Sequence, residues 1–152
     1  MGYRVSAKVD YAVRAAASLA ATQLSVPGGA TMSRAEDLAR DLAIPPRFLV
    51  NILSDLRRAG LVASQRGAQG GYLLARGAAN VTVGEVVKAV DPELLPEQHS
   101  KALSELWNRV SDAVDTILDG VSLADLALAG GFAAAPSRVP CRKEGIAGEP
   151  YL

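Results

Sequence analysis

The sequence is poor in the residues that build metal and disulfide sites. It contains one cysteine, Cys141, and one histidine, His99, among 152 residues. A single thiol cannot form an internal disulfide, a four-cysteine zinc site or a complete cysteine-ligated iron–sulfur cluster. Structural disulfides are therefore excluded within the chain, and we expect a protein of the reducing cytoplasm.

Long apolar runs are also absent. The stretch from residue 9 to residue 24 is interrupted by Asp10 and Arg14, whereas a membrane-spanning helix needs about 20 predominantly apolar residues. We therefore expect no membrane association. Hydrophobic residues nevertheless make up 49% of the sequence, which is enough for one globular domain with a substantial core.

Sequence motifs of catalysis are missing as well. The chain has no paired-carboxylate or nucleophile motif and no phosphate-binding loop of the form GxxxxGK[ST]. The glycines at 67–71 follow an expected strand but lead into another strand, which is the wrong context for a dinucleotide site. We predict that the protein is not an enzyme.

The charges that are present are unevenly distributed. The 16 basic residues balance 16 acidic ones overall, yet residues 1–80 carry ten basic and five acidic residues, a balance of +5. Residues 81–152 carry six and eleven, a balance of −5. This asymmetry is typical of a polyanion-binding module joined to a second unit.

Helical periodicity dominates the N-terminal half. Apolar spacing predicts a helix over residues 5–24, and the pattern Ser33-Arg-Ala-Glu36 predicts a capping box that starts a second helix, ending near Leu42. Pro45 and Pro46 open a third helix that Gly60 ends. We expect the inner face of the third helix to consist of Phe48, Leu49, Ile52, Leu53 and Leu56.

The period then changes to that of a β-hairpin. Residues 61–66 and 72–75 read as two strands, and residues 67–71 form a glycine-rich turn between them. Helices joined by a short turn and followed by a hairpin are the order of a winged helix-turn-helix.

The C-terminal part is helical again. A capping box, Thr82-Val-Gly-Glu85, predicts a helix to Val90, and a long helix follows over residues 101–119. A last short helix begins at a Ser122-Leu-Ala-Asp125 box. The long helix carries an apolar stripe typical of a helix that pairs with another, made of Leu103, Leu106, Val110, Val114 and Ile117.

The predicted fold class is thus mainly α with a small β-hairpin wing. We predict a winged helix-turn-helix DNA-binding domain over residues 1–80. A connecting helix, a loop and a dimerisation helix occupy residues 81–129, and residues 130–152, which lack periodicity, form a tail.

Five segments in order carry a family resemblance. They are KVDYAVR at 8–14, IPPRFLVNILSDLRRAGLV at 44–62, RGAQGGYLLAR at 66–76, TVGEVVKAV at 82–90, and LW at 106–107 with SLADLA at 122–127. Together they resemble the Rrf2 family of bacterial winged-helix transcription regulators. The resemblance implies a homodimer crossed through the long helix and bound to double-stranded DNA at a palindromic operator.

Candidate base-reading residues lie on the third helix. Arg47 and Asn51 are four residues apart and so share one helix face. An arginine can bond guanine O6 and N7, and an asparagine can bond adenine N6 and N7. Both positions match those at which family members read bases, whereas Val50 departs from the glutamate common in the cluster-binding branch.

The wing and the first helix supply further candidates. We expect Arg66 to enter a narrow minor groove, where negative potential is concentrated. The neighbouring loop would contact the sugar-phosphate backbone; alternatively, its glycines only serve hairpin geometry. Phosphate contacts or ordinary surface roles are both open for the remaining basic and aromatic candidates. The further candidates are Gly67, Gln69, Gly70, Gly71, Lys8, Tyr11, Arg14 and Arg58, and for Arg57, beside Arg58, a backbone contact and a solvated charge are equally open.

The segment that corresponds to the family's sensor segment lacks the cysteine ligands found there in the cluster-binding branch. The cluster-binding branch places three cysteines there, whereas residues 91–100 contain none. The resemblance is therefore to the branch without iron–sulfur cysteines, and we expect no cofactor. We interpret His99, with Glu93 and Glu97, as a solvated loop rather than a metal site, and Cys141 as an inert thiol. A small-molecule or protein effector stays open.

These observations favour one function over another. We expect a cytoplasmic, homodimeric, sequence-specific DNA-binding regulator, and a repressor rather than an activator, since blocking a promoter needs only tight binding. The alternative is a winged-helix protein-interaction module that docks a metabolic enzyme or other protein, with DNA binding secondary.

Overall fold

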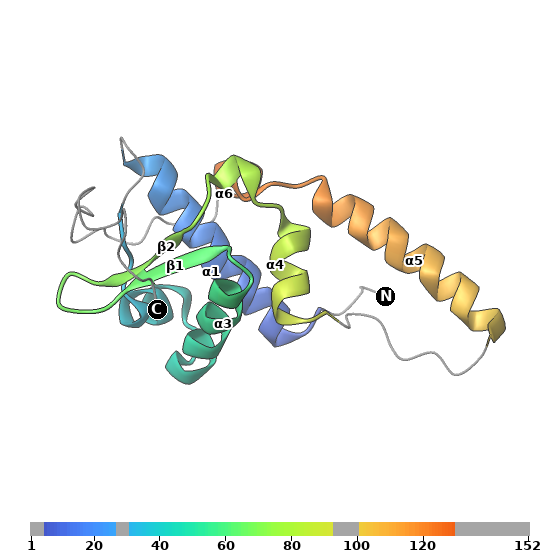
Figure 1. Ribbon diagram of the computed structural model, residues 1–152, viewed down its shortest axis with the longest axis horizontal. Coiled ribbons are helices and arrows are strands. Elements are labelled where there is room, and N and C mark those ends of the chain that lie inside the picture. The colour runs from blue at the N-terminus through green and yellow to red at the C-terminus, as the bar shows by residue number, and fades with distance from the viewer. Residues whose placement is uncertain (1–4, 27–30, 93–100, 130–152) are drawn as a thin grey trace.

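The computed structural model describes residues 5–26, 31–92 and 101–129 (Figure 1). The fold is mainly α with a two-stranded antiparallel sheet, as the sequence predicts. The elements are α1 (Ala7–Ser25), α2 (Ala35–Leu42), α3 (Pro46–Arg58), β1 (Val62–Gln65), β2 (Gly71–Leu74), the 3₁₀ turn η1 (Ala78–Asn80), α4 (Val83–Val90), α5 (Lys101–Asp119) and α6 (Leu123–Leu128). None of the described helices is both long and apolar enough to cross a membrane.

Helix α1 is the centre of the core. Ser6 caps its start by accepting a hydrogen bond from the Val9 N–H at 3.2 Å. Its buried face is built mostly of alanines, and α2, α3, α4, α6 and β2 all contact it. Small side chains let neighbouring backbones approach closely, so α1 can pack against all of these elements at once.

The helix-turn-helix joint follows the predicted chemistry. Ala43 adopts a left-handed conformation with φ 53° and ends α2, and Pro46 is the first residue of α3. The N–H of the buried Ile44 donates to the Ala39 carbonyl at 2.9 Å, which anchors the turn. Gly60, with φ 77°, lies in the left-handed region just beyond α3.

The capping box predicted at Ser33 and Glu36 is wrong. Arg34 is the N-cap of α2 and its side chain makes no capping hydrogen bond. Ser33 instead forms an antiparallel bridge with Tyr72, in which each backbone N–H donates to the other's carbonyl at 2.8 Å. These two bonds hold Ser33 in an extended segment beside the hairpin. Its hydroxyl makes no capping bond to α2 and is buried without a hydrogen-bond partner among the described residues.

The predicted inner face of α3 is correct except at Phe48. Leu49, Ile52, Leu53 and Leu56 are fully buried, whereas Phe48 is 48% exposed and meets the Tyr11 ring edge-on at 6.1 Å. Successive helical residues are rotated by about 100°. Phe48 therefore lies at the flank of the buried stripe rather than inside it.

The wing is a short hairpin with an extra strand-like segment. β1 and β2 pair in the register Val62↔Leu74, Ser64↔Tyr72 and Gln65↔Gly71. The bridge from Ser33 to Tyr72 attaches the residues before α2 to the other edge of β2. A Cβ at Gly71 would lie 2.7 Å from the Ser33 carbonyl oxygen, so the two backbones are too close for a side chain there.

The starts of α4 and α6 are joined. Both predicted capping boxes are confirmed, at Thr82 with Glu85 and at Ser122 with Asp125. Between them the Val83 N–H donates to Val121 at 2.9 Å and the Leu123 N–H donates to Val81 at 2.8 Å. The hydrophobic core accordingly continues across residue 80 into α4 and α6, and the functional division placed there stays a prediction.

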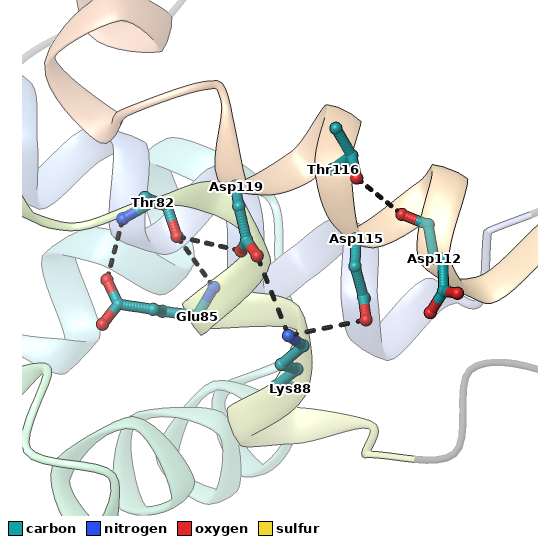
Figure 2. Close-up of polar contacts among 7 residues, drawn as sticks. All are labelled: Thr82, Glu85, Lys88, Asp112, Asp115, Thr116 and Asp119. Carbon is teal, nitrogen blue, oxygen red and sulfur yellow. Dashed lines mark hydrogen bonds and ion pairs between the residues drawn. The ribbon is translucent and has the colours of Figure 1, made fainter.

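Helix α5 spans the predicted residues and projects from the body (Figure 1). Figure 2 shows its polar joint with α4: Lys88 Nζ lies 3.6 Å from an Asp115 carboxylate oxygen and 3.9 Å from one of Asp119. The Thr82 hydroxyl donates to Asp119 at 3.5 Å. A Cβ at Gly84 would lie only 2.0 Å from Asp119 Oδ1, so α4 and the end of α5 are in close contact.

Gly71→Ala should destabilise the protein by about 1–3 kcal/mol, since its methyl group must push the Ser33 backbone away. Urea denaturation followed by circular dichroism measures the change. Gly77→Ala is the matched control, because its Cβ would meet nothing closer than Asn80 Nδ2 at 3.5 Å. Equal stability of the two variants would contradict the proposed contact.

Candidate nucleic-acid interface

The outer face of α3 presents the two predicted base-reading residues side by side. Arg47 and Asn51, together with Pro46 and Val50, line a shallow depression of about 360 Å³. All four side chains are exposed. Among the described residues neither Arg47 nor Asn51 has a hydrogen-bond or ion-pair partner, so their donors are available to a ligand.

The wing carries Arg66 directly after β1, and its side chain is exposed. Gly67 follows with φ 109°, a left-handed conformation that favours glycine, and Gln69 is also exposed. The Arg34 guanidinium donates to the Ala68 carbonyl and so ties the hairpin tip to the start of α2. The wing is held in place by a contact 34 residues apart in sequence.

The alternative reading of the wing glycines, that they serve the geometry of the hairpin, has direct support at two of them. A Cβ at Gly70 would lie 2.1 Å from the Gln65 carbonyl oxygen, and Gly71 is equally confined by Ser33. At Gly67 a Cβ would meet nothing within 4 Å. Gly70 and Gly71 are thus required by packing, and a DNA contact at these glycines stays a prediction.

The candidates on α1 are engaged within the chain. Lys8 Nζ lies 3.1 Å from Asp55 of α3, and Arg58 is 3.8 Å from the same carboxylate. Arg14 donates to the Leu42 carbonyl at 2.6 Å and lies 6.0 Å from the Tyr11 ring centre. Lys8 and Arg14 thus join α1 to α3 and to the end of α2, whereas Arg58 pairs within α3. The predicted phosphate contacts of these side chains stay predictions.

Basic side chains elsewhere on the body are neutralised locally. Arg76 donates to Glu85 at 2.7 Å, and this bond, with that from the Thr82 N–H, lowers the pKa of the Glu85 carboxyl. Arg40 is paired with Asp37 and Asp41. By contrast, Arg47 and Arg57 on α3 and Arg66 on the wing have no carboxylate partner among the described residues.

Arg34 is a residue that sequence reasoning does not identify. It lies inside the falsely expected capping box, and its contact with Ala68 joins segments far apart in the chain. Arg57, at the other end of α3, comes close to the same region: both residues line a cleft beneath the wing. No local pattern signals that proximity.

The apolar stripe of α5 is largely uncovered in the single chain. Leu103 and Leu106 are each 50% exposed and Ile117 is 68% exposed, while Val110 and Val114 are half-buried. Val114 and Ile117 also border an apolar cavity of about 310 Å³ between α1, α4 and α5. The stripe and the cavity form one continuous apolar surface.

Comparison with known proteins identifies the family to which this architecture belongs. Residues 5–129 match the Rrf2 family, described as an iron-dependent transcriptional regulator. A helix-turn-helix-type transcriptional regulator of Mycobacterium tuberculosis is 36% identical over 135 residues, which cover 82% of this chain and 81% of that protein.

Solved structures agree. The structure of CymR, the global cysteine regulator of Bacillus subtilis, has a TM-score of 0.70 and 30% identity, covering 86% of this chain and all of that chain. IscR of T. potens has a TM-score of 0.69 and 32% identity, covering 85% and 89% of the two chains.

The described residues offer no set of ligands for the iron in the family description. The sequence offers one thiol, Cys141, outside the described residues, as are His99, Glu93 and Glu97. Across residues 5–26, 31–92 and 101–129 there is no group of three His, Cys, Asp or Glu side chains that could hold a metal ion. The Asp10 carboxylate belongs to no such group and is paired with the Arg14 guanidinium at 3.6 Å.

The winged helix-turn-helix, the solvent-facing Arg47 and Asn51, and the match over residues 5–129 lead to one conclusion. The chain belongs to the Rrf2 family of helix-turn-helix transcription regulators.

Proposed function

We propose that this regulator is a cytoplasmic repressor that binds a palindromic operator as a homodimer, without an iron–sulfur cluster and without catalytic activity. The observation that carries the proposal is the pair Arg47 and Asn51, exposed together on α3 with no partner among the described residues. An unpaired arginine and asparagine on a recognition helix have the donors and acceptors that read base edges in the major groove.

The wing adds a second contact to the same duplex. Arg66 is exposed on the hairpin, whose tip projects beyond the helical body (Figure 1). With α3 in a major groove, a projecting wing reaches the adjacent minor groove, where narrow A·T-rich segments attract arginine. The roles assigned are base reading for Arg47 and Asn51 and groove insertion for Arg66.

A second copy of the chain is the proposed occupant of the exposed stripe on α5. The helix has 19 residues and so is about 28 Å long. Leu103 and Leu106 lie toward its projecting end, with half of each side chain open to solvent. Antiparallel crossing of two such helices would bury both stripes and relate the two winged domains by a two-fold axis, which predicts two-fold related half-sites.

Repression follows from position rather than from an additional activity. A dimer bound across a promoter blocks polymerase access through affinity alone. Activation would require a surface for polymerase, and no feature of the described residues marks one.

Selection of sequences from a random duplex library should enrich a palindrome, and Arg66→Ala should bind the enriched duplex roughly tenfold more weakly than wild type, about 1.4 kcal/mol. Fluorescence anisotropy at several salt concentrations measures the affinity. Arg76→Ala is the control, since Arg76 is paired with Glu85 away from α3 and the wing tip.

Failure to enrich any sequence, with weak binding indifferent to Arg66→Ala, would overturn this proposal. That result would favour the alternative of a protein-docking module, which pull-down of a metabolic enzyme from the source organism would then test.

Asn51→Ala should relax the requirement for a single base pair in each half-site, with discrimination at that position falling by about 1–3 kcal/mol. A panel of operators, each with one base pair changed, maps the loss. Lys101→Ala, at the far end of α5, serves as the comparison. An even loss across all positions would show that Asn51 contacts the backbone instead of a base.

Leu103→Asp combined with Leu106→Asp should convert the dimer into a folded monomer, because a charge in the apolar stripe cannot be buried without a partner. Analytical ultracentrifugation gives the mass and circular dichroism checks the fold. Glu105→Ala, between the two leucines but exposed, is the control. A dimer unchanged by the double substitution would contradict the assigned interface.

A further inference from the structure

A second cleft lies beside the recognition face, beneath the wing. It has a volume of about 360 Å³ and lies between the start of α2, the end of α3 and the hairpin. Arg34, Arg57 and Arg66 contribute to its walls from those three elements, and Glu36 is the one carboxylate among its lining residues. The balance of three cations against one anion makes the cleft suited to a negatively charged group.

The arginines differ in whether they already have a partner within the chain. Arg34 donates to the Ala68 carbonyl and so fixes the wing over the cleft. Arg57 is half-buried, and its guanidinium has no hydrogen-bond or ion-pair partner among the described residues. A guanidinium kept partly out of water and not ion-paired with a carboxylate can bind an anion, since burial strengthens its interaction with a ligand of opposite charge.

The first turn of α2 adds donors to the same wall. No side chain caps this helix at Arg34, and Arg34, Ala35 and Glu36 border the cleft. The first N–H groups of a helix have no partner within it. They supplement the arginines on one side of the cleft.

The geometry of the duplex identifies the ligand. The major and minor grooves are separated by a sugar-phosphate strand. If α3 occupies a major groove and Arg66 the adjacent minor groove, as the proposed function holds, that strand must pass between α3 and the wing. The cleft containing Arg57 is what lies between them.

We propose that this cleft holds one backbone phosphate of the operator in each half-site, with Arg57 as the charged contact and Arg34 as the residue that positions the wing over it. The inference rests on the proposed function and adds a contact that positions the protein without reading sequence. Arg57 sets the register of α3 against the strand that divides the two grooves.

The test is the salt dependence of operator binding by Arg57→Gln, measured by fluorescence anisotropy between about 50 and 200 mM salt. Each phosphate contact contributes about 0.9 to the slope of log K against log salt. Two subunits that each lose one contact should lower the slope by about 1.8. The affinities for operator and random duplex should fall by the same factor, so that specificity is unchanged.

Arg57→Lys, which keeps the charge, should restore the slope, and Arg76→Gln should leave it at the wild-type value. Circular dichroism and thermal melting confirm that each variant is folded. A wild-type slope in a folded Arg57→Gln protein would overturn the proposal.

Neutral methylphosphonates placed one at a time along the operator locate the contact. At one position in each half-site the replacement should weaken wild-type binding and leave Arg57→Gln unaffected. Losses that add to those of Arg57→Gln at every position would overturn the inference. So would an Arg57 Nε–H resonance that shifts with inorganic phosphate but not with operator duplex.

Failure of the proposed function gives a different result. Wild-type protein that selects no sequence removes both proposals together, whereas a normal wild-type operator complex that Arg57→Gln does not alter removes this one alone.

Discussion

The packing of small side chains along α1 is the contact on which the other elements depend. Ala12, Ala15, Ala16 and Ala20 are almost completely buried, and the helix-turn-helix, the wing and the α4–α6 pair all rest on this helix. Larger residues at these positions would separate elements that now touch. The distance between α3 and the wing follows from how closely each approaches α1, and the proposed fit to adjacent grooves depends on that distance.

Many basic side chains of the described residues are paired with carboxylates, whereas Arg47, Arg57 and Arg66 are not. On the body, carboxylates are paired with Arg40, Arg76 and Lys88, and on α1 the Lys8 and Arg14 ammonium and guanidinium groups are held by Asp55 and Asp10. Surface pairs of this kind contribute little stability. In a chain whose overall charge is zero, they leave Arg47, Arg57 and Arg66 as cations of α3 and the wing without a carboxylate partner among the described residues, where they can attract a polyanion.

Local sequence signals predicted most of the elements, and long-range contacts decided the exceptions. The boxes at Thr82 and Ser122 formed because no long-range backbone pairing draws these residues away from the helix start, and the Thr82 hydroxyl accepts from Glu85 while it donates to Asp119. The similar pattern at Ser33 failed because the backbone of Ser33 pairs with that of Tyr72, 39 positions later. Phe48 lies outside the core because the buried stripe covers only part of the circumference of α3. At the site, helical spacing was enough to place Arg47 beside Asn51, but the cleft that Arg34 and Arg57 share depends on the wing's tertiary position, which no spacing rule contains.

The joint between α4 and α5 has a mechanical meaning in a dimer. Lys88, Thr82 and the close approach of Gly84 hold one end of α5 through Asp115 and Asp119, while the remainder of the helix projects like a lever arm. For an arm about 28 Å long, a tilt of about 10° moves the free end by about 5 Å, which exceeds the rise of about 3.4 Å between successive base pairs. If two copies pair through α5 as proposed, the stiffness of these few polar contacts would set how many base pairs of variation in half-site separation the dimer tolerates.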